Sequence, residues 1–425
     1  MTHFGILCPA GDGHLNPMTT LGYELLRRGH RVTVFNFLDA KAKTLASGLE
    51  FQPLAEDEFP AGSIAEGFSQ RGKLSGLAAF RYTVKLLAKT STTILAEAPA
   101  VIKKTGVEVL LIDQVTLEGG TIADFLDLPF ITVCSALLIN QDPSISPFCT
   151  TWQYNPTWKG RLRNQLGYQL LSLLAKPIRE QIADYRREWK LPLYSHPNDY
   201  YSKLAQISQE PAEFEFPRLN LPPHFHFTGP FHNPVTRKAV PFPFEQLTGK
   251  PLIYASMGTI QNRLLRVFQI IASACEELDA QLVISLGGGA TPESLPKLPK
   301  NPIVVSYAPQ LELLQKAALT ITHAGMNTTL ESLSNGVPMV AIPVANDQPG
   351  VATRIAWTGV GKVVPLKQLS VPKLRDAIRK VLTEESYKKR AIAFQEVIQR
   401  SGGTSRAADI IEQVISTRQS VIAQK

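Results

Sequence analysis

The feature that most constrains the fold of this sequence is the alternation of short apolar segments with longer amphipathic ones along the whole chain. A short apolar run bounded by turn residues is typical of a buried strand, and the segments that follow have helical spacing. Strands that alternate with helices are typical of parallel sheets covered by helices on both faces. The sequence therefore predicts an α/β fold with parallel sheets.

The predicted strands form two groups, separated by a proline-rich segment that lacks periodicity. The first group is expected at residues 4–8, 31–35, 107–112 and 130–133. The second group is expected at residues 252–255, 281–285, 303–306, 319–322 and 339–342. The 425-residue chain is too long for one ordinary core and fits two domains of about 200 residues each. We expect a first doubly wound domain at 1–232, a linker at 233–250, a second domain at 251–400, and a C-terminal segment at 401–425, with a helix at 404–423, that packs back on the first domain.

The composition excludes several classes of protein. Hydrophobic residues make up 44% of the chain and charged residues 19%, which is typical of a globular protein rather than a disordered one. No apolar run reaches the roughly 18–20 residues that span a bilayer, and the N-terminus lacks the features of a signal peptide. Four scattered cysteines without a C-x-x-C pair indicate free thiols in a reducing compartment. We therefore expect a cytoplasmic protein.

The most informative stretch is LTITHAGMNTTLESLSNGV, in which an apolar strand ends at His323, Gly325 allows a tight turn, and a helix begins at about Asn327. The free N–H groups and the dipole at such a helix start favour a phosphate or diphosphate. Thr328 adds a hydroxyl, and Glu331 lies one turn on, where a carboxylate could bind ribose hydroxyls. The alternative is a simple helix cap beside a core histidine, but a cap does not require this combination of residues.

Three further loops follow strands of the same predicted sheet, at the edge where open α/β sheets bind ligands. The loop at 256–259 carries Gly258, where a backbone could approach a phosphate. The loop at 307–310 offers an aromatic face for a base and an amide for its edge or for the ribose. Asp347 and Gln348 follow the last predicted strand and could bind sugar hydroxyls. Each loop alone is a weak signal, but four at one edge favour a nucleotide-sugar site.

Together these segments resemble the signature of the family-one UDP-glycosyltransferases, which include plant secondary-product glucosyltransferases and bacterial macrolide glycosyltransferases. The resemblance covers essentially the whole chain and implies the GT-B fold. In that fold two Rossmann-like doubly wound domains face each other across a cleft, the first binding the acceptor and the second the UDP-sugar. The matching residues are Tyr307-Ala308-Pro309-Gln310, His323-Ala324-Gly325-Met326-Asn327-Thr328, Glu331 and Asp347-Gln348.

The resemblance also implies roles for these residues. Tyr307, where plant members usually have tryptophan, would stack on uracil, and the Ala308 backbone would contact the edge of the base. Gln310 and Glu331 would bind the ribose. The diphosphate would lie at the helix start beside His323, and the sugar beside the two residues that follow the last strand. The donor-binding set is therefore Ser256, Gly258, Thr259, Tyr307, Ala308, Gln310, His323, Gly325, Asn327, Thr328, Glu331, Asp347 and Gln348.

The loop after the first predicted strand carries His14. It lacks the third glycine of a G-x-G-x-x-G phosphate-binding loop. We expect the next helix to begin at Asn16 and Pro17, so that His14 lies just before a helix N-terminus whose positive end keeps the imidazole neutral. Asp113 ends another strand, where its carboxylate could orient the ring. From the residues alone, a cap and a solvated acid explain the pair equally well, whereas the resemblance implies a catalytic base with its aspartate.

The resemblance implies an inverting reaction, in which His14 takes the proton of the acceptor hydroxyl as its oxygen attacks the sugar from the face opposite UDP. No D-x-D motif occurs in a fitting context, so we expect no metal ion and no cofactor. The run D-Q-P-G-V-A at 347–352, with Arg354 after it, resembles the carotenoid (zeaxanthin) glucosyltransferase branch. We therefore expect UDP-glucose and a small lipophilic acceptor, such as a carotenoid or a phenolic. The alternatives are an enzyme for soluble phenolics, flavonoids or macrolides, a UDP-sugar epimerase of the GT-B fold, and a non-catalytic lipophile- or nucleotide-binding protein.

The net charge of +8 fits an anionic ligand, an anionic membrane surface or a nucleic acid. No nucleic-acid-binding signature occurs, so we expect no nucleic acid partner. Residues 159–190 carry eight basic and three acidic side chains and a leucine stripe at helical spacing: Leu162, Leu166, Leu170 and Leu173. Such a helix fits peripheral contact with an anionic membrane, but it is also typical of an ordinary solvated face. The pattern specifies no oligomeric state.

Overall fold

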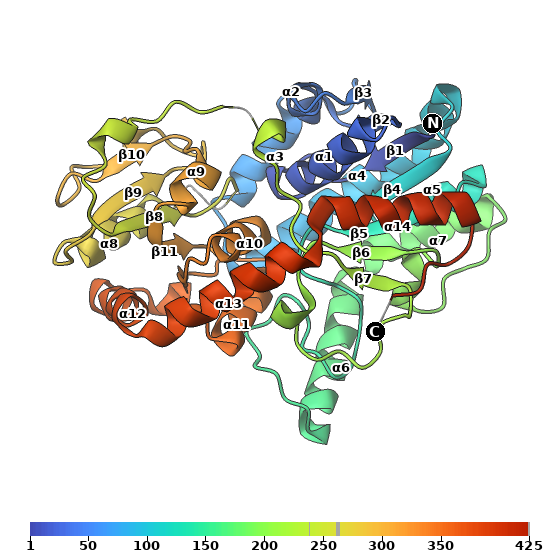
Figure 1. Cartoon of the computed structure of the whole chain (residues 1–425). Helices are drawn as coiled ribbons and strands as arrows, with labels where there is room; N and C mark the ends of the chain where they lie inside the picture. The colour runs from blue at the N-terminus through green and yellow to red at the C-terminus, as the bar shows by residue number, and fades with distance from the viewer. Residues whose placement is uncertain (238, 261–263, 424–425) are drawn as a thin grey trace.

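A computed structural model describes residues 1–237, 239–260 and 264–423. It consists of two parallel β-sheets, each covered by helices, that form two lobes lying side by side (Figure 1). The predicted α/β fold with two parallel sheets is therefore confirmed. The predicted linker at 233–250 and the C-terminal segment at 401–425 include residues 238 and 424–425, which lie outside the described residues.

The first sheet has seven strands, and every neighbouring pair is parallel. Its order changes direction between β1 and β4, because β2 and β3 lie on one side of β1 and the later strands on the other. The strands in spatial order are β3 (Glu50–Pro53), β2 (Arg31–Asn36), β1 (His3–Leu7), β4 (Val109–Asp113), β5 (Phe130–Cys134), β6 (Gln206–Ser208) and β7 (Phe225–Phe227).

The second sheet has six strands, again all parallel. It repeats the arrangement of the first, with the change of direction between β8 and β11. The strands in spatial order are β10 (Ile303–Val305), β9 (Gln281–Ser285), β8 (Leu252–Ser256), β11 (Ala317–Thr322), β12 (Met339–Ala341) and β13 (Gly361–Val363).

Helices connect the strands and cover both sheets. The helices of the first half are α1 (Asp12–Arg27), α2 (Lys41–Ala46), α3 (Ser63–Arg71), α4 (Gly76–Thr105), α5 (Gly119–Leu126), α6 (Trp158–Leu174) and α7 (Lys176–Glu188). Those of the second half are α8 (Leu265–Cys275), α9 (Gln310–Leu314), α10 (Met326–Ser334), α11 (Gln348–Thr358), α12 (Val371–Thr383), α13 (Glu385–Ser401) and α14 (Gly403–Thr417). No helix of the described residues is long and apolar enough to cross a membrane.

All nine predicted strands are present, with ends that differ from the prediction by at most two residues. The strands β3, β6, β7 and β13 were not predicted. Each has only three or four residues, which is too short for a hydrophobic period to be recognised.

Two predicted helix ends are wrong. The first helix begins at Asp12 rather than at Asn16 and Pro17, so Pro17 lies inside the helix. Proline has no N–H and removes the bond to the carbonyl four residues earlier, which here belongs to Gly13. The last helix ends at Thr417 rather than at 423, and the segment after it bonds instead to the first sheet, where the His226 ring contacts the Val421 carbonyl at 3.0 Å.

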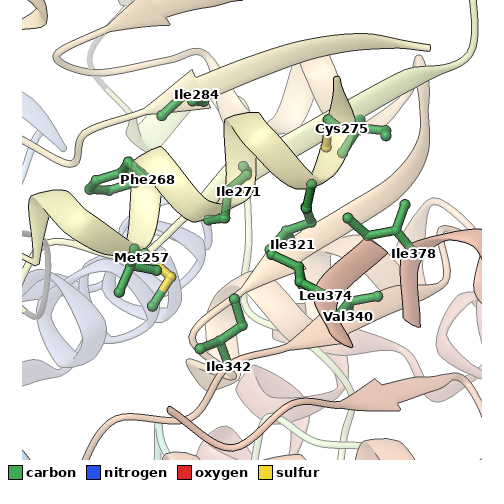
Figure 2. Packing of buried hydrophobic residues seen from close by; sticks show 14 of the residues in the cluster. Met257, Phe268, Ile271, Cys275, Ile284, Ile321, Val340, Ile342, Leu374 and Ile378 are labelled. Atoms are coloured by element: carbon green, nitrogen blue, oxygen red, sulfur yellow. The ribbon is translucent and has the colours of Figure 1, made fainter. Parts of the chain in front are cut away.

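The second sheet is buried on one face by α8 and α12 (Figure 2). Phe268 and Ile271 on α8 and Leu374 and Ile378 on α12 are fully buried in one cluster with side chains from β9, β11 and β12. Burying side chains of this size stabilises the fold by roughly 1.5–3 kcal/mol each. This core makes the second sheet a rigid support for the loops at its carboxyl edge.

The C-terminal helices return the chain from the second lobe to the first (Figure 1). Helix α13 packs on α10 in the second half, and α14 packs on α1 in the first. The packing is completed by Arg28, which donates 2.7 Å hydrogen bonds to Asp409 and Glu412. Apolar residues of α14, including Ile411 and Val414, belong to the core cluster of the first sheet. The end of the chain therefore forms part of the first structural unit.

Candidate active site

Ligand-binding side chains in open α/β sheets gather where the strand order changes direction, outside the carboxyl ends of the strands. In the first sheet this point lies between β1 and β4. Here His14 follows β1, Asp113 ends β4, and Ser135 follows β5. Because these three strands are neighbours, their ends bring the three side chains together.

The three side chains form one hydrogen-bonded group. Nδ1 of His14 lies 3.0 Å from Oδ2 of Asp113 and 2.9 Å from Oγ of Ser135. The Ser135 hydroxyl also donates to Oδ2 of Asp113. The other carboxylate oxygen accepts a 3.0 Å bond from the backbone N–H of Val115, which fixes the carboxylate. No described hydrogen bond reaches Nε2 of His14, and a quarter of its side chain is exposed, so this nitrogen is free to take a proton.

The electrostatic state of His14 differs from the expectation. Burial lowers its pKa, but the charge and hydrogen bond of Asp113 and the charge of Asp347 raise it by more, so the pKa lies above the ordinary histidine value. The prediction that the environment of His14 disfavours the imidazolium form is therefore wrong. His14 lies in the first turn of α1 rather than before it, and the adjacent carboxylate outweighs both burial and the helix start.

In the second sheet, the change of direction between β8 and β11 brings together the loops that contain Gly258 and His323. The His323 ring lies between two glycines. A Cβ added to Gly258 or to Gly325 would lie 2.5 Å from a ring atom of His323. Gly258 also has a left-handed φ of +73°. Both glycines are therefore required for the position of this ring, which explains part of the sequence motif.

The start of α10 has the features of an anion-binding site. Its N-cap is Gly325, and among the described residues no side chain caps the free N–H groups of the first turn. Burial lowers the pKa of His323 to about 4, so its ring is neutral at pH 7 and can act as an uncharged hydrogen-bond donor. Thr328 lies in the same turn, and its hydroxyl accepts a 3.3 Å bond from Gln310. Ser256 ends the adjacent strand β8, and its hydroxyl accepts a 3.3 Å bond from Gly258 N in the loop that follows, where Thr259 is exposed.

The predicted ribose ligands are linked to each other. Glu331 is buried, and its carboxylate accepts hydrogen bonds from Gln310 and from Arg237 in the linker. The hydroxyl of Tyr254 donates a 3.0 Å bond to the amide oxygen of Gln310. Tyr307 is half exposed, and its ring lies so close to Gly288 that a Cβ there would meet the hydroxyl at 2.0 Å. The partly buried Ala308 completes this edge of the site.

The predicted sugar ligands lie at the start of α11, where Asp347 is the N-cap and Gln348 is the first residue. The amide oxygen of the buried Gln348 accepts 2.9 Å bonds from the backbone N–H groups of Val344 and Ala345, so this residue shapes the loop itself. Asp347 accepts a 3.4 Å bond from Leu137 N in the first half. Burial raises the pKa of the Asp347 carboxyl.

Hydrogen bonds join the two halves of the site directly. Asn327 donates from Nδ2 to the Gly13 carbonyl at 3.0 Å, and its Oδ1 accepts from Gln209 at 2.9 Å. The Gly13 carbonyl is available because Pro17, four residues on in α1, has no N–H to bond it. The start of α10, where the diphosphate is predicted to bind, is therefore adjacent to the start of α1, which carries His14.

Sequence reasoning missed several residues of this site. Ser135 directly follows a predicted strand, and its position beside the strand of Asp113 could have been inferred only from the strand order. Gln209 directly follows the unpredicted strand β6, and Arg237 lies in the predicted linker, where no periodicity marks it. Arg71 at the end of α3 carries a buried positive charge and lies in a segment without any motif.

The basic stretch at 159–190 is two helices, α6 and α7, rather than one. Helix α6 projects from the body of the molecule (Figure 1). Its leucine stripe is solvent exposed together with Trp158 at its start, with exposed fractions of Trp158 70%, Leu162 49%, Leu166 57%, Leu170 59% and Leu173 69%. On α7, Arg186 is buried against Asp124 at 2.7 Å, and Arg187 is paired with Asp184. The excess charge available at the surface is therefore carried by α6 more than by α7.

Comparison with known proteins decides the family. The model of the UDP-glucoronosyl and UDP-glucosyl transferase family matches residues 9–400. This chain belongs to that family. A zeaxanthin glucosyltransferase of Pantoea ananas is 32% identical over 100% of this chain and 98% of its own, and one of Pseudescherichia vulneris is 31% identical over 99% and 100%. The crystal structure of the kitacinnamycin glycosyltransferase matches with a TM-score of 0.76 at 22% identity, covering 97% of this chain and 98% of that one.

The predicted membership of the UDP-glycosyltransferases and the GT-B fold are thus confirmed, and the protein is a glycosyltransferase enzyme. The family implies a nucleotide-sugar donor and a small-molecule acceptor. Within the described ranges, no three His, Cys, Asp or Glu side chains are grouped so that they could hold a metal ion. The roles of individual residues, the donor, the acceptor and metal independence stay predictions.

Proposed function

We propose that this glycosyltransferase transfers glucose from UDP-glucose to a hydroxyl group of a small lipophilic acceptor and inverts the configuration at the anomeric carbon. The observation that carries the proposal is the His14–Asp113 pair, which lies beside the uncapped start of α10 across the contact of Asn327 with Gly13. A base and an anion-binding helix start, facing each other, are the two groups that displacement of a diphosphate by a hydroxyl requires.

In the proposed mechanism, Nε2 of His14 takes the proton of the acceptor hydroxyl as the oxygen forms a bond to the anomeric carbon. The bond from that carbon to the diphosphate breaks on the opposite face. Asp113 accepts the hydrogen bond from Nδ1 and stabilises the imidazolium that forms. The negative charge that develops on the leaving diphosphate is stabilised by the N–H groups of α10 and by the neutral His323 ring. No metal ion takes part.

In the proposed donor site, Tyr307 stacks on uracil, and Gln310 and Glu331 bind the ribose. The Glu331 carboxylate already accepts hydrogen bonds from Arg237 and Gln310, which hold it in place for the ribose hydroxyls. Asp347, whose charge acts on His14, binds the hydroxyls of the glucose. The similarity to two zeaxanthin glucosyltransferases supports glucose as the sugar and a carotenoid as the acceptor class.

The test is a product assay with matched donors and acceptors. The purified protein is supplied with UDP-glucose, UDP-galactose or dTDP-glucose, and with either zeaxanthin in detergent micelles or a water-soluble phenol. We expect the highest kcat/KM with UDP-glucose and zeaxanthin. A preference for the phenol, a flavonoid or a macrolide would contradict the acceptor class, and hydrolysis or epimerisation of the donor without transfer would contradict the reaction.

We further propose that α6 docks on an anionic membrane surface, where a carotenoid acceptor resides. The helix carries three basic residues and no acidic one, and its leucine stripe with Trp158 at one end is exposed. An apolar face flanked by cations is typical of helices that lie in the bilayer interface, and each nearby cation adds about 1 kcal/mol on anionic lipid. The cytoplasmic leaflet is the surface proposed.

Sedimentation with lipid vesicles tests this docking. The protein should bind vesicles that contain anionic lipid at low salt, bind neutral vesicles weakly, and dissociate as salt rises. The double variant Leu166→Gln and Leu170→Gln should lose binding, whereas Leu45→Gln, at an exposed leucine of α2, should keep it. Arg186 is unsuitable for such a test because its burial against Asp124 serves the fold. Equal, negligible binding to both vesicle types would contradict the docking and favour a soluble acceptor.

A further inference from the structure

The end of α3 and the start of α4 belong to the first half of the chain but pack on the second. A Cβ added to Gly72 would lie 2.4 Å from the backbone oxygen of Ile260, in the loop after β8. Leu74 packs against the core of the second sheet. Gly76 N donates a 3.2 Å bond to the carbonyl of Val344, in the loop after β12. This junction therefore lies between two loops of the proposed donor site.

Helix α3 also adjoins the start of α1, where His14 lies. A Cβ added to Gly11, at the N-cap of α1, would lie 3.2 Å from the ring of Phe68 on α3. The last residue of α3 is Arg71. Arg71 therefore lies between the start of α1, which carries the proposed base, and the loops of the proposed donor site.

Arg71 is a buried cation without a partner. It is 6% exposed, and within the described chain no hydrogen bond or ion pair reaches its side chain. Burial lowers its pKa to about 10, and Asp347 acts on it only as a more distant charge, so the guanidinium is protonated at pH 7. Its charge also lowers the pKa values of His14 and His323, which places it near both halves of the site.

An unpaired buried charge is costly and is normally offset by an opposite charge. The opposite charge that the proposed reaction brings to this position is the diphosphate of the donor. A guanidinium also matches phosphate oxygens better than any other side chain does. We propose that Arg71 binds the donor diphosphate from the first half of the chain, opposite the start of α10.

This proposal rests on the proposed function and adds one consequence to it. The diphosphate would be held from both halves of the molecule, by α10 on one side and by Arg71 on the other. Donor binding would then complete the ion pair that the free protein lacks, and the charge that develops on the leaving group would meet a full positive charge in a site without a metal ion.

Calorimetric titration of the full chain with UDP and with uridine tests the proposal. Arg71→Met should weaken UDP binding by about tenfold to a hundredfold, because a charge-assisted bond to phosphate is lost, and should leave uridine binding unchanged. Arg71→Lys should give an intermediate loss. The matched control is Lys73→Met, which removes an exposed cation two residues further on and should leave both affinities unchanged.

The melting temperature of the free protein separates a binding role from a structural one. Because Arg71 has no partner among the residues that the structure describes, Arg71→Met should leave Tm unchanged or raise it, while reducing the Tm increase that UDP causes. Unchanged UDP affinity in folded Arg71→Met would overturn the proposal, as would a lower Tm with equal loss of UDP and uridine binding. If the wild type binds dTDP rather than UDP, the proposed donor is wrong, and the same comparison with dTDP and thymidine tests Arg71 independently.

Discussion

Nδ1 of His14 lies 3.0 Å from Oδ2 of Asp113, and this contact joins the first turn of α1 to the end of β4. It leaves Nε2 as the only ring nitrogen of His14 without a described partner. The pair therefore has the geometry of a base and the group that orients it, and most of the account can be tested through it.

Replacement of His14 should separate catalysis from donor binding. His14→Ala should lower kcat by about 10²–10⁴-fold, because proton removal from the acceptor is lost. UDP affinity should change little, since the proposed nucleotide site lies in the second half of the chain. Calorimetry with UDP supplies the control. A large loss of UDP affinity in this variant would contradict the assignment of proton removal to the first half of the chain and of nucleotide binding to the second.

The pH profile should report the charge of Asp113. Neutral His14 is the active base, and Asp113 raises its pKa, so kcat/KM should rise with pH to an inflection above the ordinary histidine value. In Asp113→Asn the charge is gone, so the inflection should move to lower pH while the rate falls. Ser135→Ala keeps the carboxylate and should move the inflection much less. An inflection that stays in place in Asp113→Asn would exclude His14 as the titrating group or Asp113 as its partner.

Glu331 offers a test of the nucleoside half of the site. Glu331→Gln keeps the shape of the side chain but removes the charge, and should weaken binding by about 1–3 kcal/mol through lost charge-assisted bonds. UDP and uridine should lose the same amount, because both carry the ribose, in contrast to Arg71→Met. Undiminished uridine affinity would remove Glu331 from the site, and a fall in Tm would assign the effect to its pairing with Arg237.

Metal independence has a direct assay. Activity should persist after dialysis against EDTA and should not rise when magnesium or manganese is restored, because helix N–H groups and cations of the chain offset the diphosphate charge. The EDTA-treated protein should keep its Tm as a control for folding. Strict dependence on a divalent ion would contradict this account of the leaving group.

The fold was predictable because its central strands are uniformly apolar and its helices amphipathic. The strand order could not be predicted, because it depends on contacts between segments that are distant in the sequence. For the same reason Ser135 was missed, although its hydroxyl completes the hydrogen-bonded group of His14. The donor motif was recognisable because Gly258 and Gly325 are sterically required beside His323. Arg71 has no such local signal, because what distinguishes it is burial without a partner among the described residues.

The start of α1 shows why a local rule failed. Proline is favoured in the first turn of a helix, so Pro17 was interpreted as a first-turn residue, but it lies further inside. Pro17 has no N–H for the carbonyl of Gly13, and this carbonyl instead accepts a hydrogen bond from Asn327 in the second half of the chain. Pro17 is therefore accommodated inside α1 by a contact between the two halves of the chain, which a local sequence pattern does not reveal.

The anomeric configuration of the product tests the central claim most directly. In UDP-glucose, the proposed donor, the glucose is α-linked. Attack by the acceptor oxygen from the face opposite UDP, with His14 as base, must therefore give a β-linked glucoside. Proton NMR of the product made by the wild-type protein from zeaxanthin or a soluble phenol distinguishes the two anomers by the coupling of the anomeric proton. The account predicts the β-glucoside alone. An α-glucoside would mean retention of configuration, and would contradict single displacement with His14 as the base.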